Sequence, residues 1–265
     1  MYSSFQLACK YLQYYLSAAN GKGHGVHSPF VYRFIDQVLN DKLKYPCYTE
    51  VEAIRAGLLE DRTSITVTDF GAGSAMINDH TRVVKRVAQT SLKSAKYAQL
   101  MFRIVQYFKP ENIIELGTSF GVTTSYMANG YPQSKIYSLE GAPSIAAIAR
   151  QVFERQGLRQ IELIEGRFAD TLPGLLQKLQ HVNLAYVDGH HQYAPTIEYF
   201  HWLKEKAGPQ TVFIFDDIHW SSGMEKAWKE ICDDPAVTRS IDLFFIGLVF
   251  FDPSFKKKER FRIRF

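Results

Sequence analysis

Three aspartates follow apolar segments in the second half of the chain, where their carboxylates could hold a cation. Asp188 follows Val182–Val187, and Asp216 and Asp217 follow Thr211–Phe215. Carboxylates packed together raise one another's pKa unless a cation or a histidine neutralises them. Oxygen ligands of this kind suit Mg, Ca or Mn. The sequence therefore predicts a divalent-metal site on Asp188, Asp216 and Asp217, with helix capping and turn formation as the alternative roles.

Two adjacent histidines, His190 and His191, follow Asp188 in what reads as a loop. Because they are neighbours, one can enter the site while the other points away. A lone histidine usually serves packing, whereas an imidazole beside a cation site suits general-base chemistry because its pKa lies near neutrality. We predict His190 or His191 as the catalytic base, and the sequence leaves the choice between them open.

A glycine-containing turn follows the apolar segment Ile113–Leu116. Its sequence is Glu115-Leu116-Gly117-Thr118-Ser119-Phe120-Gly121. Ligands of doubly wound sheets bind at the carboxyl ends of the strands, where glycines let them approach the backbone. The spacing Glu-x-Gly-x-x-x-Gly is not the Gly-x-Gly-x-x-Gly of dinucleotide enzymes, and the absent Gly-Lys-Ser/Thr excludes a Walker-type phosphate cradle. The turn thus indicates a cofactor site of another kind, or else a plain tight connection.

Glu140 closes the next apolar segment, Ile136–Leu139. A carboxylate at that position can accept two hydrogen bonds from a ribose diol. Together with the glycine turn, Glu140 indicates a nucleoside-containing cofactor. A second glycine-rich segment, Asp69–Ser74, looks like a nucleotide turn, but no strand–helix–strand pattern follows it. We predict a loop or lid there.

Short apolar strands alternate with amphipathic helices from Ile113 onward, and this alternation positions all of these residues. The predicted strands are Ile113–Leu116, Ile136–Leu139, Ile161–Ile164, Val182–Val187 and Thr211–Phe215. The predicted helices are Val122–Ala128, Ser144–Gln156, Thr171–Gln180 and Tyr193–Lys206. Such a pattern predicts an α/β fold with a doubly wound, mostly parallel sheet covered on both faces.

The two ends of the chain depart from this alternation. Ser240–Phe251 and Arg260–Phe265 read as strands joined by a short polar turn, which predicts an antiparallel C-terminal hairpin. Helical periodicity predicts helices near residues 5–16 and 91–108, and Ser28 followed by Pro29 marks a further helix start. We expect a helical N-terminal region, residues 1–110, and a second domain, residues 111–265.

Composition narrows the protein class. The chain has 265 residues, 46% of them hydrophobic, with a formal net charge of +4, so it is neither disordered nor a disulfide scaffold. Its one dense basic cluster, Lys256–Lys258 with Arg260, reads as a solvated turn rather than a nucleic-acid site. No segment approaches the roughly 18 apolar residues of a membrane span. Three scattered cysteines and no signal-peptide pattern predict reduced thiols in a cytoplasmic protein.

The region Ile113–Phe265 resembles class I S-adenosylmethionine-dependent methyltransferases, and among them the metal-assisted small-molecule O-methyltransferases of catechol and macrocin type. The glycine turn, Glu140, Asp188, the Asp216-Asp217 pair and the terminal hairpin carry the resemblance. It implies a seven-stranded Rossmann-like sheet whose seventh strand alone is antiparallel. It also implies methyl transfer to an oxygen of a small molecule, with the N-terminal region as substrate lid.

The resemblance also implies roles for individual residues. Around S-adenosylmethionine, it places Gly117 and Gly121 at the methionine part, Ser119 or Thr123 near its carboxylate, Glu140 on the ribose, and Gly166 and Phe168 near the adenine, with Glu115 beside the same turn. Asp217 stands where catechol-type enzymes have Asn, and an Asp-Asp pair matches the macrocin type. His190 and His191 stand where the macrocin and catechol types have an Asp and a Lys base.

Two other functions stay open from the sequence: a non-catalytic protein that binds the adenosyl cofactor, and a NAD-dependent oxidoreductase on a similar sheet. The missing second glycine of the turn and the C-terminal hairpin count against the oxidoreductase. We expect a small-molecule acceptor as partner, and neither nucleic acid nor a membrane. The sequence does not identify the acceptor or the oligomeric state, for which a homodimer is one alternative.

Overall fold

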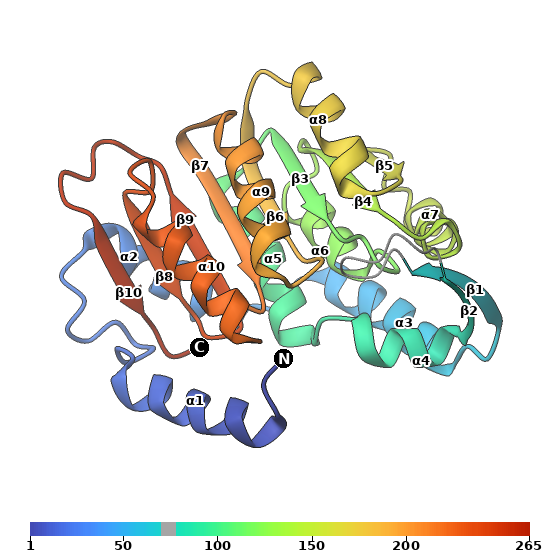
Figure 1. The fold of residues 1–265 in the computed structure, drawn as a ribbon, viewed down its shortest axis with the longest axis horizontal. Helices are drawn as coiled ribbons and strands as arrows, with labels where there is room; N and C mark the ends of the chain where they lie inside the picture. The colour runs from blue at the N-terminus through green and yellow to red at the C-terminus, as the bar shows by residue number, and fades with distance from the viewer. Residues whose placement is uncertain (70–77) are drawn as a thin grey trace. The chain divides into compact units, whose positions relative to one another are not determined.

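A computed structural model describes residues 1–69 and 78–265 (Figure 1). Contacts group the chain into two compact units, one of Met1–Asp41 with Leu176–Phe265 and one of Lys42–Leu175. Apart from Asp69, the predicted loop Asp69–Ser74 lies outside the described residues. Among the helices of the described ranges, none has the length and apolar character that crossing a bilayer requires.

The unit Lys42–Leu175 contains three parallel strands in the order β3-β4-β5. They are β3 (Asn112–Leu116), β4 (Lys135–Glu140) and β5 (Ile161–Glu165). Helix α6 (Val122–Gly130) connects β3 to β4, α7 (Pro143–Gln156) connects β4 to β5, and α8 (Phe168–Lys178) follows β5. The predicted strand–helix alternation is confirmed here.

The same unit begins with α3 (Pro46–Glu60), β1 (Ser64–Asp69), β2 (Asn78–Val83), α4 (Val84–Ser91) and α5 (Ala95–Phe108). Strands β1 and β2 pair antiparallel, although only helices were predicted in this stretch. The β-branched residues of β1 favour an extended chain, and alternation over so few residues is a weak signal. The helix predicted near residues 91–108 begins at Ala95, after α4 has ended at Ser91.

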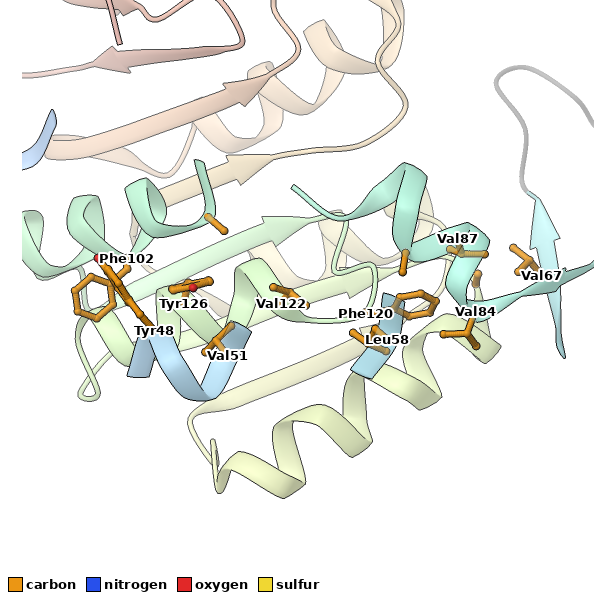
Figure 2. Packing of buried hydrophobic residues seen from close by; sticks show 13 residues of the cluster. Tyr48, Val51, Leu58, Val67, Val84, Val87, Phe102, Phe120, Val122 and Tyr126 are labelled. Atoms are coloured by element: carbon orange, nitrogen blue, oxygen red, sulfur yellow. The ribbon is translucent and has the colours of Figure 1, made fainter. Parts of the chain in front are cut away.

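An aromatic and aliphatic core joins these helices (Figure 2). Tyr48 of α3 meets the ring of Phe102 of α5 at a centroid distance of 5.2 Å and that of Tyr126 of α6 at 5.4 Å, both edge to face. Phe120, from the glycine turn, is fully buried in the same cluster. Packing of Phe120 in this core therefore fixes the position of the glycine turn.

The other unit contains five strands in the order β10-β8-β9-β7-β6. They are β6 (Val182–Val187), β7 (Ala207–Asp216), β8 (Arg239–Asp242), β9 (Ile246–Phe250) and β10 (Glu259–Arg262). Its helices are α1 (Ser4–Ser17), α2 (Pro29–Phe34), a short π-helix (Ile35–Leu39), α9 (Tyr193–Lys204) and α10 (Ser222–Asp233). Strand β6 pairs parallel with β7, and β9 pairs antiparallel with both β7 and β8.

The antiparallel C-terminal hairpin exists, but its predicted strands are wrong. Ser240–Phe251 is not one strand, because the chain reverses at Leu243–Phe245 and forms β8 and β9. At the reversal Phe244 has φ of 71°, and its N–H donates to Asp242 Oδ1 at 2.8 Å. An apolar run conceals this turn because an aspartate side chain, not a glycine, stabilises it. Strand β10 pairs parallel with β8, not antiparallel with the strand before it.

The α/β class and the mostly parallel Rossmann-like arrangement are confirmed. Among the described residues, the two units contain eight strands of this kind, five in the order β10-β8-β9-β7-β6 and three in the order β3-β4-β5, whereas seven were predicted.

One residue of the basic cluster Lys256–Lys258 with Arg260 has a clear structural role. Lys258 Nζ donates to the carbonyls of Cys232, Asp233 and Asp234, where cations stabilise the C-terminal end of α10.

Candidate active site

The glycine turn between β3 and α6 uses backbone conformations that suit glycine. Gly117 has φ of 108° and Gly121 has φ of 76°, and between them Ser119 has φ of 50°. Gly121 also needs its missing side chain, because a Cβ there would lie 2.5 Å from Cε1 of Phe153. The conformation of the turn therefore depends on glycine at these positions, which a loose connecting loop would not require.

Glu115 holds this turn to its neighbours. The residue is fully buried, and its Oε2 accepts hydrogen bonds from Thr124 Oγ1 at 2.6 Å and Ser138 Oγ at 2.5 Å. Ser138 Oγ also lies 2.5 Å from Thr118 Oγ1. Since these partners come from α6, β4 and the turn itself, the buried Glu115 carboxylate holds the turn against α6 and β4.

Glu140 meets the turn from the end of β4. Its Oε2 accepts from the backbone N–H of Ser119 at 2.9 Å, and its Oε1 accepts from that of Ala142 at 3.0 Å. Burial raises the pKa of Glu140, although these N–H groups favour the charged form and offset part of the effect. Each carboxylate oxygen keeps a second lone pair with which to accept a hydroxyl.

The remaining predicted cofactor residues lie around the same strand ends. Gly166, with φ of 131°, follows β5 and donates its N–H to the carbonyl of Glu140 at 2.9 Å. Phe168 is buried at the start of α8, and Thr123 is half-buried near the start of α6. The side chain of Ser119 lies 2.9 Å from Ser91 Oγ, a neighbour that no motif signalled. The structure thus gathers the predicted cofactor residues at one edge of β3, β4 and β5.

The acidic residues form a second group, at the ends of β6 and β7 in the other unit. Asp188, His191 and Asp216 each offer a ligand atom, and these atoms all lie within 4.8 Å of one another. His191 Nε2 lies 3.5 Å from Asp188 Oδ1, and its Nδ1 lies 3.9 Å from Asp217 Oδ2. Asp216 is only 1% exposed. Two carboxylates and an imidazole at this spacing are a donor set that fits a divalent cation.

The two adjacent histidines diverge. His191 lies among the aspartates, whereas His190 Nδ1 lies 2.8 Å from the hydroxyl of Tyr199 on α9. Tyr186 donates its hydroxyl to Asp188 Oδ2 at 2.9 Å. Alternation along β6 could have indicated Tyr186, because residues two apart share a strand face. Tyr199 had no sequence signal, since helix packing alone brings it to His190.

The backbone around this group is strained. His190, His191 and Asp217 have φ of 62°, 29° and 52°, in the left-handed region that disfavours side-chain-bearing residues. Each such residue costs on the order of 1–3 kcal/mol, and such residues concentrate at functional sites. The N–H of Asp217 donates to the carbonyl of Phe245 at 2.7 Å, which anchors the strained turn to the β8–β9 reversal.

Known proteins resemble the chain over this region. Residues 114–218 match the family described as Methyltransferase domain. The catechol O-methyltransferase of Niastella koreensis is 30% identical over 131 residues, 48% of this chain and 57% of that protein. The catechol O-methyltransferase of Mycobacterium tuberculosis is 25% identical over 152 residues, 57% of this chain and 67% of that protein. The chain thus spans between about half and two thirds of the length of these relatives.

Solved structures agree on the fold. The O-methyltransferase from Bacillus cereus in complex with SAH has a TM-score of 0.57 at 20% identity, covering 83% of this chain and 97% of its own. The O-methyltransferase TomG from Streptomyces achromogenes, in complex with SAM, has a TM-score of 0.54 at 20% identity, covering 61% and 82%. The chain therefore shares the fold of these O-methyltransferases, and its residues 114–218 match a methyltransferase domain, in agreement with the predicted resemblance to S-adenosylmethionine-dependent O-methyltransferases.

Proposed function

We propose that this protein transfers a methyl group from S-adenosylmethionine to an oxygen atom of a small molecule, with assistance from a divalent metal ion. The observation that carries the proposal is the turn after β3, whose Ser119 N–H is bonded to the Glu140 carboxylate within the matched domain. Catechol O-methyltransferases among the relatives support oxygen as the acceptor atom.

The cofactor contributes an activated methyl group. The protein therefore has to bind the cofactor and the acceptor, align the acceptor oxygen with the methyl carbon, and remove the proton of the acceptor hydroxyl. Glu140 would accept the ribose hydroxyls, and the glycine turn would border the methionine part. Gly166 and Phe168 would lie near the adenine, and Ser119 or Thr123 near the amino-acid carboxylate. Glu115 is assigned a positioning role because its side chain is fully buried and bonded within the protein.

Asp188, Asp216 and His191 are the residues we assign to the metal ion, since their ligand atoms lie within 4.8 Å. A divalent ion there would lower the pKa of a coordinated hydroxyl. Asp217, which the sequence predicts as a further ligand, would instead orient His191, whose Nδ1 lies 3.9 Å from its carboxylate. Mg, Mn and Ca remain the candidate ions.

His190 is then the candidate base. The hydroxyl of Tyr199 lies 2.8 Å from its Nδ1 and orients the ring; with Nδ1–H donating to that hydroxyl oxygen, Nε2 would be the nitrogen that takes the proton. A histidine with one nitrogen tethered is the usual arrangement of a general base. His190 would take the proton of the acceptor hydroxyl as the new carbon–oxygen bond forms.

A second candidate function follows from the position of His191. The ring lies 3.5 Å from Asp188 and 3.9 Å from Asp217, so contacts within the chain would hold these carboxylates in place of a metal ion. The protein would in that case be a metal-independent enzyme or a non-catalytic binder of the adenosyl cofactor.

Three measurements on the full chain separate these functions. Thermal shifts with S-adenosylhomocysteine and with NAD identify the cofactor, because a ligand of the folded state raises Tm. A shift with NAD alone would refute the methyltransferase. Labelled methyl transfer to phenols, sugars and carboxylates then tests turnover, and binding without any product would leave the non-catalytic binder.

The metal ion is tested by calorimetry with Mn²⁺ on wild type, Asp216→Asn and His191→Ala. Mn²⁺ binding that wild type shows and both variants lose supports the assignment, whereas methyl transfer unchanged by EDTA and by Asp216→Asn refutes it.

We also propose that the methyl acceptor is a small molecule, that the protein is located in the cytoplasm, and that residues 1–110 act as a substrate lid.

A further inference from the structure

Helix α1 exposes a stripe of apolar residues. Phe5 is 79% exposed, Leu12 is 58% exposed and Leu16 is 72% exposed, with the exposed Cys9 between them. Positions 5, 9, 12 and 16 are spaced by four, three and four residues, so these side chains share one face of the helix. This is the spacing of a seam between two packed helices. We refer to these four residues as the α1 stripe.

The opposite face of α1 holds the helix in place. Tyr14 is buried, and its hydroxyl donates to the carbonyls of Asp242 and Ile263. Lys10 Nζ lies 3.0 Å from both carboxylate oxygens of Glu225. Because the contacts of Lys10 and Tyr14 fix its rotation, α1 cannot roll to cover its own stripe. The stripe is a preorganised surface.

Charge favours a second copy of the chain as the occupant. Helix α1 has a single charged residue, Lys10, and that residue is paired with Glu225. Two stripes can therefore meet without bringing like charges together. A helix that lies on a lipid surface needs exposed lysines or arginines beside its apolar face. Within Ser4–Ser17 the only such residue is engaged, and the neighbouring Arg264 is engaged as well, since it packs over the Tyr15 ring at 4.3 Å and its Nε donates to the Tyr15 carbonyl at 2.7 Å.

The exposed area is of the size that a dimer needs. Met1 is 85% exposed just before α1, and Tyr15 is 44% exposed in the last turn of the helix. Aromatic side chains bury about 150–250 Å² each when fully covered. Together with the stripe, these residues supply several hundred Å² per copy, approaching the roughly 800 Å² per partner of a standard interface. Contiguous apolar patches of this extent mark interaction sites.

We propose that α1 forms the interface of a homodimer, in which two copies of the helix pack antiparallel about a twofold axis. A twofold interface pairs each position with its counterpart reciprocally. The register that centres the stripe places Phe5 of one copy against Leu16 of the other, and Cys9 of one copy against Leu12 of the other.

Sedimentation velocity over a concentration series tests the interface. We expect a wild-type dimer and a monomer for Leu12→Glu and Leu16→Glu, each checked for folding by circular dichroism. Leu43→Glu is the matched control, because Leu43 is 68% exposed outside α1, and it should stay dimeric. A monomeric wild type at tens of micromolar, or a dimer that survives both α1 variants, would overturn the proposal.

Cysteine cross-linking tests the register. Leu12→Cys places a thiol opposite Cys9 of the second copy, so mild oxidation should give a covalent dimer that Cys9→Ser abolishes. The control Leu43→Cys should not cross-link at the same rate, and equal rates would contradict the register. A further outcome would refute the dimer: a monomeric wild type that co-sediments with phosphatidylcholine–phosphatidylglycerol vesicles, while Leu12→Glu and Leu16→Glu do not. That result would assign α1 to a lipid surface.

Discussion

The backbone N–H of Ser119 donates to Oε2 of Glu140 at 2.9 Å, and this bond joins the turn after β3 to the end of β4. The second oxygen of the same carboxylate accepts from Ala142 N–H, so the carboxylate plane is fixed. A group held in this way loses little conformational entropy when a ligand arrives. The cofactor site we propose is therefore preorganised.

Glu140→Gln should weaken binding of S-adenosylhomocysteine by about 10–100-fold, since a hydrogen bond to a charged group contributes about 1.5–3 kcal/mol. Isothermal titration calorimetry measures the change. Glu165→Gln is the matched control, because Glu165 pairs in register with Glu140 on the neighbouring strand but is exposed and bound to Arg150. Equal losses in the two variants would contradict the ribose role.

The raised pKa of Glu140 predicts a pH dependence. Burial raises it, so the carboxyl is protonated at a higher pH in the folded state than in the unfolded chain. Affinity for the cofactor should fall as pH falls through that raised pKa. The stability contribution has the opposite direction: it is fully present below the unfolded pKa and is lost as pH rises through the folded pKa. Calorimetry and urea unfolding between pH 4.5 and 7.5 check both trends, and Glu140→Gln should flatten them.

Gly121→Ala should destabilise the protein by about 2–4 kcal/mol, because it combines an unfavourable φ with overlap of the Phe153 ring. Gly157→Ala is the control: its φ is 66°, but nothing lies within 4 Å of its added Cβ, so about 1 kcal/mol is expected. Urea unfolding measures both. Phe153→Leu should recover part of the loss in Gly121→Ala, and full additivity of the two changes would refute the steric account.

His219 should stabilise the protein more at low pH than at high pH. Burial acts to lower its pKa, but the hydrogen bonds and charges of Asp242 and Glu225, at 3.0 and 3.1 Å, outweigh burial and raise it. A raised pKa gives stability that is fully present below the unfolded pKa and lost as pH rises through the folded pKa. His219→Gln should therefore cost about 1–2 kcal/mol more at pH 6 than at pH 9 by urea unfolding. Equal costs of His219→Gln at the two pH values would contradict this account.

The three thiols should differ in reactivity. Burial raises the pKa of Cys47 to about 11 and that of Cys232 to about 11, whereas Cys9 is exposed on α1. Because the thiolate is the nucleophile, iodoacetamide at pH 8 should modify Cys9 first, at protein concentrations low enough that the proposed α1 dimer has dissociated. Peptide mass spectrometry identifies the modified residue. Prior labelling of Cys47 or Cys232 in the folded protein would contradict this order.

Local pattern sufficed for the elements that surround the cofactor turn. The apolar runs at β3, β4, β5 and β6 lie between clear helical segments, so periodicity alone predicted them. The β8–β9 reversal was missed because the run Ser240–Phe251 is mostly apolar, and its one charged residue, Asp242, is the residue whose side chain stabilises the turn. The pairing of β10 with β8 depends on an open strand edge, which no local pattern describes.

The sequence by itself determined the order of strands and helices, because hydrophobic period and turn chemistry act over a few residues. It also determined which carboxylates stand at strand ends, Glu140 and Asp188 among them. Only the tertiary structure decided that His191 lies among the aspartates while His190 meets Tyr199, since adjacent residues on a strained loop diverge according to their packing. Which atom a side chain contacts depends on elements distant in the chain, and that is information the folded chain alone contains.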